Sequence, residues 1–333
     1  MDRPYLGKLD YADPLYEILI SHVCPGVSDP RFHVNRMSAR LVYKYTEEKT
    51  RIAIIGKFFR LNDTKTERVS RIKSEYDNLQ KIRRYGFDTF PNYVVRPIAR
   101  DERIGLALVE EFIEGRSLDH YLQRAIYERD GDLLKEKLSS LASFLHTLHT
   151  KTKADSRAEL DQVYAYFRKV VCKLRAQQVI SHDDERACLK LMEKWLRRSL
   201  LQKAKGVIVH GDATPTNFIF TRKGDVVAID LERMKCADMA YDVGMVCGEL
   251  KHAFMWRTGN SHASEPFISH FLRAYSGHFR RMKRAFKEIT FRNPFYMALT
   301  ELRIARNHYL DWNYRKRLAH EAFECLRCGL RFR

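Results

Sequence analysis

Short apolar runs separated by polar turns characterise the first part of the chain, and this pattern predicts strands. Residues 34–45 and 51–59 are two such runs on either side of a polar turn, and they predict a β-hairpin. The segment before them, residues 1–33, contains four prolines and one apolar run, and it predicts a helix-containing extension. A later apolar run, residues 106–113, predicts a strand that leads into an acidic link containing Gly115.

One helix of this first part can be oriented from its periodicity. Its apolar positions share one helical face: Val69, Ile72, Tyr76, Leu79 and Ile82. Glu75 falls on that face, whereas Asp77 points away from it. Because Lys57 is the only cation in an apolar strand and a buried ammonium needs a carboxylate partner, we predict a Lys57–Glu75 ion pair. The alternative is that Lys57 extends to solvent from an edge strand and that Glu75 lies at the boundary of the apolar face.

Helical periodicity replaces the strand pattern beyond the acidic link, which predicts a boundary between two lobes near residue 115. Ser117 is a suitable N-cap for a helix over residues 118–126. Further helices are predicted over residues 133–148, 156–203, 243–250 and 265–333. The second lobe is therefore expected to be mainly helical.

Three apolar runs interrupt this helical part and predict buried strands over residues 207–209, 218–220 and 226–229. Asp212 and Asn217 lie in the loop between the first two strands, and Asp230 follows the third. Phosphoryl transfer needs a carboxylate that orients the attacking hydroxyl and accepts its proton, and it needs oxygen ligands for Mg²⁺ on the nucleotide phosphates. These three side chains supply both requirements.

The same residues match a known motif. In the protein-kinase pattern H-R-D-x-x-x-x-N, the Asn follows the catalytic Asp by five positions, and the metal-binding Asp comes beyond a hairpin. Here His210-Gly211-Asp212 stands in place of His-Arg-Asp, with Asn217 at the matching distance, and Asp230-Leu231-Glu232 replaces Asp-Phe-Gly. The combination resembles the aminoglycoside phosphotransferase and choline kinase family of small-molecule phosphotransferases.

The resemblance implies an α+β, protein-kinase-like fold of two lobes, with a small antiparallel β N-lobe and a mainly helical C-lobe. The N-lobe would span residues 34–115 after the extension of residues 1–33. The C-lobe would span residues 116–333 and carry the catalytic loop, residues 207–232. The implied activity is Mg²⁺-dependent transfer of phosphate from ATP, with GTP as the alternative donor, to a hydroxyl of a small molecule.

Site roles also follow from the resemblance. Asp212 would be the catalytic base, Asn217 and Asp230 would hold Mg²⁺, and Lys57, positioned by Glu75, would bind the nucleotide phosphates. His210 would pack under the loop, and Asp242 would brace the loop backbone. The adenine hinge would be formed by Glu111, Phe112 and Ile113. Ser38 would lie at the tip of the nucleotide-covering loop. Asp242 also begins an apolar helix, where the alternative is a simple N-terminal cap. Residues 34–40 contain no glycine, unlike the phosphate-covering loop of protein kinases.

The net charge of the chain and its distribution bear on the chemical class of the acceptor. The net charge is +18, and residues 251–333 hold 17 Lys and Arg against six Asp and Glu. Such a surplus near an acceptor pocket favours a neutral or anionic hydroxyl compound, such as a sugar, a sugar phosphate or a glycolipid headgroup, and disfavours a polycation. The resemblance itself suggests an alternative acceptor, an aminoglycoside, as in antibiotic resistance. The basic surplus has its own alternative explanation, a solvated helical surface without a binding role.

Other functional classes have weaker support. A protein kinase, or a kinase-fold binding module without turnover, is the main alternative, but no Ala-Pro-Glu follows Asp230. The basic run at residues 280–284 is a weak basis for nucleic-acid binding, so no nucleic-acid partner is expected. Seven scattered cysteines form no disulfide framework, and no apolar run reaches the length of a membrane span, so we expect a cytoplasmic protein without stable membrane insertion. The oligomeric state is left open.

Overall fold

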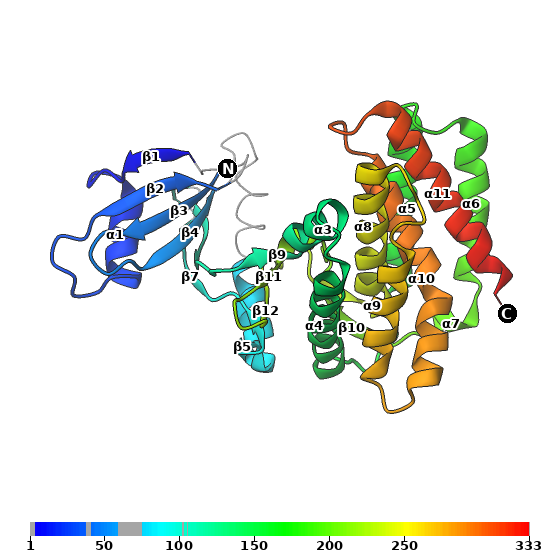
Figure 1. The fold of residues 1–333 in the computed structure, drawn as a ribbon, viewed down its shortest axis with the longest axis horizontal. Helices are drawn as coiled ribbons and strands as arrows, with labels where there is room; N and C mark the ends of the chain where they lie inside the picture. Colours follow the sequence, from blue (N-terminus) through cyan, green and yellow to red (C-terminus); the bar gives the residue numbers. More distant parts are fainter. Residues whose placement is uncertain (1–3, 38–40, 59–74, 102, 105, 333) are drawn as a thin grey trace. The chain divides into compact units, whose positions relative to one another are not determined.

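The structure is a computed structural model that describes residues 4–37, 41–58, 75–101, 103–104 and 106–332. It divides into two compact units (Figure 1). Unit 1 comprises residues 1–115 and 227–233, and unit 2 comprises residues 116–226 and 234–333.

Unit 1 is built on a six-stranded antiparallel sheet with the strand order β1-β2-β3-β4-β8-β7. Its strands are β1 (Tyr5–Lys8), β2 (Phe32–Arg36), β3 (Val42–Glu47), β4 (Ala53–Phe58), β7 (Pro97–Asp101) and β8 (Leu106–Glu111). Helix α1 (Pro14–His22) begins at the N-cap Asp13, whose side chain accepts from the Leu15 amide. Leu15 and Leu19 of α1 pack into one core with residues of the sheet, among them Phe32.

Two details of unit 1 differ from the sequence-based prediction. The single strand predicted over residues 34–45 corresponds to the end of β2 and the first four residues of β3. Leu41 has a positive φ of 43°, and such a conformation cannot continue a strand. The N-terminal segment supplies β1, which pairs with β2, in addition to the expected helix. Ser38 lies outside the described residues.

A helix and a small hairpin complete the described part of unit 1. The helix is described over residues 75–82 and is followed by η1 (Arg83–Phe87), β5 (Asp88–Thr89) and β6 (Asn92–Val94). Glu75, Leu79 and Ile82 are buried, whereas Asp77 is exposed, which confirms the predicted orientation of this helix. Val69 and Ile72 lie outside the described residues.

Unit 2 is mainly helical, with two small antiparallel strand pairs. β9 (Arg116–Ser117) pairs with β11 (Phe218–Phe220), and β10 (Gly206–Val209) pairs with β13 (Lys235–Asp238). Its helices are α3 (Leu118–Tyr127), α4 (Gly131–Lys151), α5 (Leu160–Ala176), α6 (His182–Leu196), α7 (Ser199–Gln202), α8 (Ala240–Thr258), α9 (Glu265–Gly277), α10 (Met282–Ala305) and α11 (Trp312–Arg331). Within the described ranges, no helix is long and apolar enough to cross a membrane.

The predicted helices of unit 2 are present, with local differences. Ser117 occupies the N-cap position of α3 but makes no side-chain cap hydrogen bond. Residues 156–203 form three helices because Gln178 has a positive φ of 57° and Ser181 starts α6 with a capping box. Strand β13 was not among the predicted elements.

Helix α10 lies at the centre of unit 2, between α8, α9 and α11 (Figure 1). The approach of α8 depends on Gly244 and Gly248, because a Cβ on either would lie within 3.0 Å of atoms of Tyr296 or Thr300. Since neighbours surround α10, every residue from Phe295 to Ala305 is buried. Charged side chains in this stretch must therefore find partners inside the protein.

Glu301 of α10 is one such buried charge. Lys251 Nζ lies 3.7 Å from Glu301 Oε1 and 2.8 Å from Glu321 Oε2. Neither carboxyl oxygen of Glu301 has a hydrogen-bond partner among the described residues. Burial raises the pKa of Glu301 from 4.5 to about 7, although Lys251 opposes this shift.

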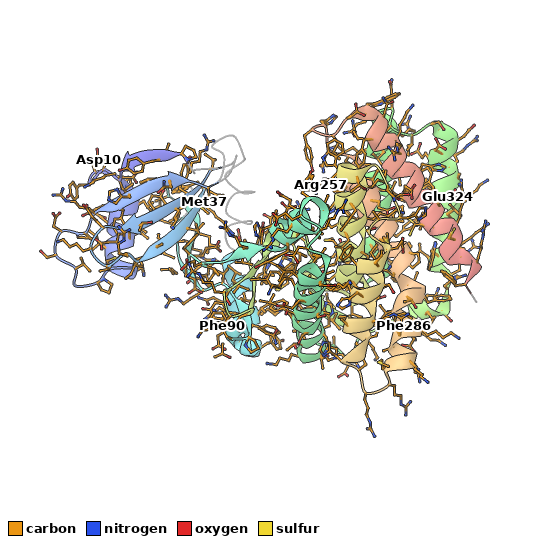
Figure 2. All side chains as sticks on the ribbon, in the orientation of Figure 1. Asp10, Met37, Phe90, Arg257, Phe286 and Glu324 are labelled. Carbon is orange, nitrogen blue, oxygen red and sulfur yellow. The ribbon has the colours of Figure 1, made fainter. Side chains whose placement is uncertain are left out.

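Glu301→Gln is expected to remove a pH-dependent component of stability. The folded-state pKa is raised, so the unfolded chain loses this proton first, and the free energy of unfolding falls as pH rises from about 4.5 to about 7. Relative to the variant, the wild-type protein should lose up to about 3 kcal/mol across this window. Chemical denaturation at several pH values measures the difference, with exposed Glu324→Gln (Figure 2) as the matched control. Parallel pH profiles for wild type and Glu301→Gln would contradict the assignment.

Candidate active site

Lys57 of β4 is the centre of an ion cluster in unit 1. Its Nζ lies 2.8 Å from Glu75 Oε1, which confirms the predicted pair, and 3.2 Å from Glu110 Oε1. Lys57 stands opposite Leu108 in the register of β4 and β8, so Glu110 is its diagonal neighbour across the sheet. Sequence reasoning missed Glu110. The sequence clue to Glu110 was its place on the same face of the strand as Leu106 and Leu108, where an acid would be buried.

Asp230 lies in a short segment that returns to unit 1 after β12 (Val226–Ala228). The segment is held by the Val95 amide, which donates to the Ala228 carbonyl at 3.1 Å, and by Asn78 Nδ2, which donates to the Leu231 carbonyl at 2.8 Å. Asp230 has a positive φ of 63°, a conformation that Asp tolerates better than most residues. The local fold thus fixes both the position of Asp230 and its backbone conformation.

Carboxylates outnumber cations in this cluster. Burial lowers the pKa of Lys57, but the charges of Glu110, Glu75 and Asp230 outweigh burial and raise it above its usual range. Burial raises the pKa of Glu110 to about 7, and Glu110 Oε2 has no hydrogen-bond partner among the described residues. Three carboxylates around one ammonium leave an excess of negative charge, and carboxylate oxygens are the ligands that Mg²⁺ prefers. In the described part of the chain, however, no group of three or more His, Cys, Asp or Glu side chains is arranged to hold a metal ion, so the fit to a divalent cation rests on the excess of negative charge.

The predicted hinge backbone is partly engaged within unit 1. The Glu111 amide donates to the Arg96 carbonyl at 3.1 Å, and the Phe112 amide donates to the Ala53 carbonyl at 3.2 Å. The Glu111 carboxylate accepts from the Tyr93 hydroxyl and the Arg96 amide. Of the three predicted hinge residues, Ile113 is therefore the one whose amide is not committed to these sheet hydrogen bonds.

In unit 2, Asp242 organises the loop that follows β10. Its Oδ2 accepts from the His210 amide at 2.7 Å, and its Oδ1 accepts from the Gly211 amide at 3.0 Å. Burial raises the pKa of Asp242, but the hydrogen bond and charge of His149 outweigh it, and the pKa is lowered overall. These contacts are the ones expected of a residue that braces the loop backbone, and both hydrogen bonds run to the loop and not to the first turn of α8.

Two histidines, His149 and His210, support the loop that carries Asp212. His149 Nε2 lies 3.1 Å from Asp242 Oδ2, and its Nδ1 lies 2.7 Å from the Tyr275 hydroxyl. His210 is fully buried, packs against the Phe218 ring, and its Nδ1 accepts from the Asp212 amide at 3.4 Å. The predicted packing role of His210 agrees with this geometry. The contact of His149 with Asp242 was not predicted, because α4 lies far from the loop in sequence.

Asp212 and Asn217 are fixed relative to each other within the loop. Asn217 ends the short helical turn η2 (Pro215–Asn217), and its Nδ2 donates to the Asp212 carbonyl at 2.9 Å. The amide orientation is thereby set, with Oδ1 as the oxygen that could bind a cation. The structure thus brings together the two predicted residues of this loop.

Arg303 of α10 is a further site residue that the sequence did not reveal. Its Nη1 donates to Asp212 Oδ1 at 2.5 Å, and its Nη2 donates to Glu249 Oε1 of α8 at 2.8 Å. All three side chains are at most 16% exposed. Burial lowers the pKa of Arg303, but the charges of Glu249 and Asp212 outweigh it and raise the pKa. A permanent cation therefore lies against the predicted catalytic carboxylate.

Comparison with known proteins assigns the fold. Solved structures that match include an ethanolamine kinase of Plasmodium vivax, with 13% identity, 90% of this chain and 84% of that chain covered, and a TM-score of 0.62. The streptomycin–ATP complex of APH(2")-IIa matches with 14% identity, 96% and 99% coverage and a TM-score of 0.58. Choline kinase LicA from Streptococcus pneumoniae matches with 18% identity, 89% and 93% coverage and a TM-score of 0.54. These likenesses confirm the predicted α+β, protein-kinase-like fold.

A family model gives the stronger evidence of relationship. No curated protein matches the sequence significantly. The model of the phosphotransferase enzyme family matches residues 30–285, which is most of the chain. The matched range contains every motif residue described above, from Lys57 to Asp242. The chain belongs to the phosphotransferase enzyme family, the group of small-molecule kinases that its motifs resemble.

Proposed function

We propose that the protein transfers the γ-phosphoryl group of ATP, or of GTP, to a hydroxyl of a small, neutral or anionic, sugar-like molecule with Mg²⁺. The loop braced by Asp242 carries this proposal, because one buried carboxylate holds the backbone from which both Asp212 and Asn217 project. Fixed placement of such groups is the main contribution that a protein makes to phosphoryl transfer.

Each residue has a role that its contacts support. Asp212 orients the acceptor hydroxyl and takes its proton, and the ion pair with Arg303 keeps the carboxylate in one orientation. Lys57, positioned by Glu75 and Glu110, binds nucleotide phosphates. Asn217 Oδ1 and Asp230 would hold Mg²⁺, which supplies neutralisation of the phosphate charge when bound. Ile113 offers a backbone donor for the purine.

Arg303 does not by itself decide the acceptor class. Its guanidinium is paired with the carboxylates of Asp212 and Glu249, so its charge is balanced within this cluster. The preference for a neutral or anionic acceptor over a polycation rests on the basic surplus of residues 251–333.

A panel of acceptors tests the proposed function. Turnover of ATP and GTP would be measured with and without Mg²⁺ in the presence of ribose, glucose, their phosphates, glycerol 3-phosphate and kanamycin. We expect saturable, Mg²⁺-dependent turnover with a sugar or sugar phosphate, and none with kanamycin. Efficient turnover of kanamycin would show the charge argument to be wrong. Failure to bind Mg²⁺–nucleotide would contradict the proposed function itself.

A further inference from the structure

Basic residues are concentrated in the turn between α9 and α10, at one end of unit 2 (Figure 1). The exposed cations of residues 279–287 are Arg280, Arg281, Lys283, Arg284 and Lys287. This segment contains no acid, and the next residue, Glu288, accepts from Arg284 Nε at 2.8 Å. The other four cations form no ion pair with any residue that the structure describes. Residues 279–287, the basic turn, therefore carry a positive charge that described acids offset only at Arg284.

Apolar side chains lie among these cations. Met282, in the middle of the basic run, is 51% exposed. Phe279 and Phe286 are half-buried, and side chains project outward from the turn beyond the ribbon (Figure 2). Lys and Arg beside exposed apolar side chains are typical of segments that lie in the interface of a membrane, where the cations meet lipid phosphates and the apolar groups leave water.

A cavity of about 360 Å³ opens beside the basic turn. The apolar residues that line it include Met239, Phe279 and Ile289, and the basic ones include Arg280, Arg281 and Arg284. Arg292 also lines this cavity, but it is buried and paired with Asp238 at 2.5 Å. The cavity thus places guanidinium donors, which suit a phosphate, next to an apolar surface. A phospholipid presents both features, since its phosphate is attached to a glyceride.

The basic turn is remote from the Asp212 loop. Helix α10 begins at this turn and leads to Arg303, which binds Asp212 (Figure 1). At about 1.5 Å per residue, Met282 and Arg303 are roughly 30 Å apart along the helix. A ligand at the turn would therefore not occupy the position proposed for the acceptor hydroxyl. The charge of the turn needs an explanation other than phosphoryl transfer.

We infer that the basic turn is a docking surface for an anionic phospholipid bilayer, with its cations against the lipid phosphates and Met282 in the interface. Clusters of about four to eight Lys and Arg are typical of segments that bind anionic lipid surfaces, and the turn has such a cluster. A nucleic acid would match the cations, but its phosphate backbone offers no apolar layer to Met282. The inference goes beyond the proposed function and does not depend on it.

Co-sedimentation with vesicles tests the docking surface. Vesicles of phosphatidylcholine alone are compared with vesicles in which about 30% of the lipid is phosphatidylglycerol, at low and at moderate salt. We expect binding to the anionic vesicles to be at least about tenfold stronger at low salt, and added salt should remove most of this difference. Equal binding to both kinds of vesicle, or binding to neither, would overturn the inference.

Variants locate the surface. Arg280→Gln combined with Arg281→Gln should weaken binding to anionic vesicles about 25-fold, because each cation near such a surface contributes about fivefold. The matched control, Lys190→Gln combined with Lys316→Gln, removes two exposed cations of α6 and α11 and should leave binding unchanged. All four side chains are exposed, so the variants should fold, and Tm checks this. An unchanged affinity in the arginine variant, or an equal loss in the control, would contradict a local surface.

Met282→Ser tests the apolar part of the surface. It should weaken binding to anionic vesicles about tenfold, since burial of this side chain is lost, and it should leave the salt dependence as in wild type. A short duplex DNA is titrated for comparison. If the DNA binds more tightly than the anionic vesicles and Met282→Ser has no effect on either, the cations serve a nucleic acid and the inference is wrong.

Calorimetry of Mg²⁺–nucleotide separates the two proposals. The arginine variant should bind Mg²⁺–nucleotide as wild type does, because the basic turn is remote from the loop. Loss of nucleotide affinity in this variant would assign the arginines to the nucleotide and overturn the docking surface. If wild type binds anionic vesicles but no Mg²⁺–nucleotide, the docking surface stands and the proposed function fails.

Discussion

Asp212→Asn is expected to lower kcat by about 10²- to 10⁴-fold, the range for loss of a positioned general base. The amide oxygen of Asn can still accept the hydrogen bond from Arg303 Nη1, so the loop geometry should persist. What the variant loses is the ability to accept the proton of the acceptor hydroxyl. Because the nucleotide phosphates are assigned to other residues, affinity for Mg²⁺–nucleotide should stay within about twofold of wild type. Single-turnover kinetics and calorimetry measure the two quantities.

The same substitution at an exposed site serves as the control. Asp161→Asn lies at the start of α5 in the same unit and should leave kcat and Tm unchanged. Arg303→Lys is a second test of the Asp212 loop. This variant keeps a cation but loses the forked guanidinium group that contacts both Asp212 and Glu249. Wild-type kcat in Asp212→Asn would show that another group takes the proton and that the role assigned to the loop is wrong.

Local sequence patterns were sufficient where the interacting residues are close in the chain or share one periodic face. The Lys57–Glu75 pair followed from a helical face on which Leu79 and Ile82 are buried and Tyr76 is partly buried. The loop with Asp212 and Asn217 followed from spacing alone, since a short loop between two strands limits where its side chains can lie. Such inferences depend on short-range geometry, which propensity and periodicity encode well.

Long-range contacts were not accessible in this way. Arg303 reaches Asp212 from α10, a helix that is buried on all sides in its second half and therefore has no apolar stripe to orient it. The sequence clue to Arg303 was weaker. A charged residue inside an apolar run needs a partner, but the sequence does not show which residue that partner is. The start of β3 at Val42 was not predicted because Leu41, the residue before it, has a positive φ that Leu rarely adopts.

The charge count over residues 251–333 also needs correction as a description of a surface. Three of its arginines are paired with acids from other segments: Arg257 with Asp119, Arg292 with Asp238, and Arg303 with Asp212 and Glu249. Other basic residues lie around the turn between α9 and α10, where Arg273 Cζ lies 5.4 Å from the ring centroid of Phe286, which is labelled in Figure 2. The surplus is thus spread over several places and partly balanced by acids, so the segment total overstates the positive charge that an acceptor would meet.

Asp230→Asn is expected to weaken binding of Mg²⁺–nucleotide by at least about 10- to 100-fold, since loss of even an outer-shell group costs that much in metal affinity. Asn is the informative substitution because it tolerates the positive φ of 63° at this position, whereas Ala would add backbone strain to the loss of charge. The hydrogen bonds that hold the segment come from Asn78 and Val95 to backbone carbonyls, so they do not depend on the carboxylate.

Calorimetric titration of nucleotide with and without Mg²⁺ separates a metal role from a purely electrostatic one. If Asp230 is a metal ligand, the variant should lose the gain in affinity that Mg²⁺ provides. Affinity for metal-free nucleotide should stay the same or rise, because one negative charge near the phosphates has been removed. Asp88→Asn, an exposed carboxylate of unit 1, should change neither titration. An undiminished Mg²⁺ effect in Asp230→Asn would remove Asp230 from the metal site and leave Asn217 without its proposed partner.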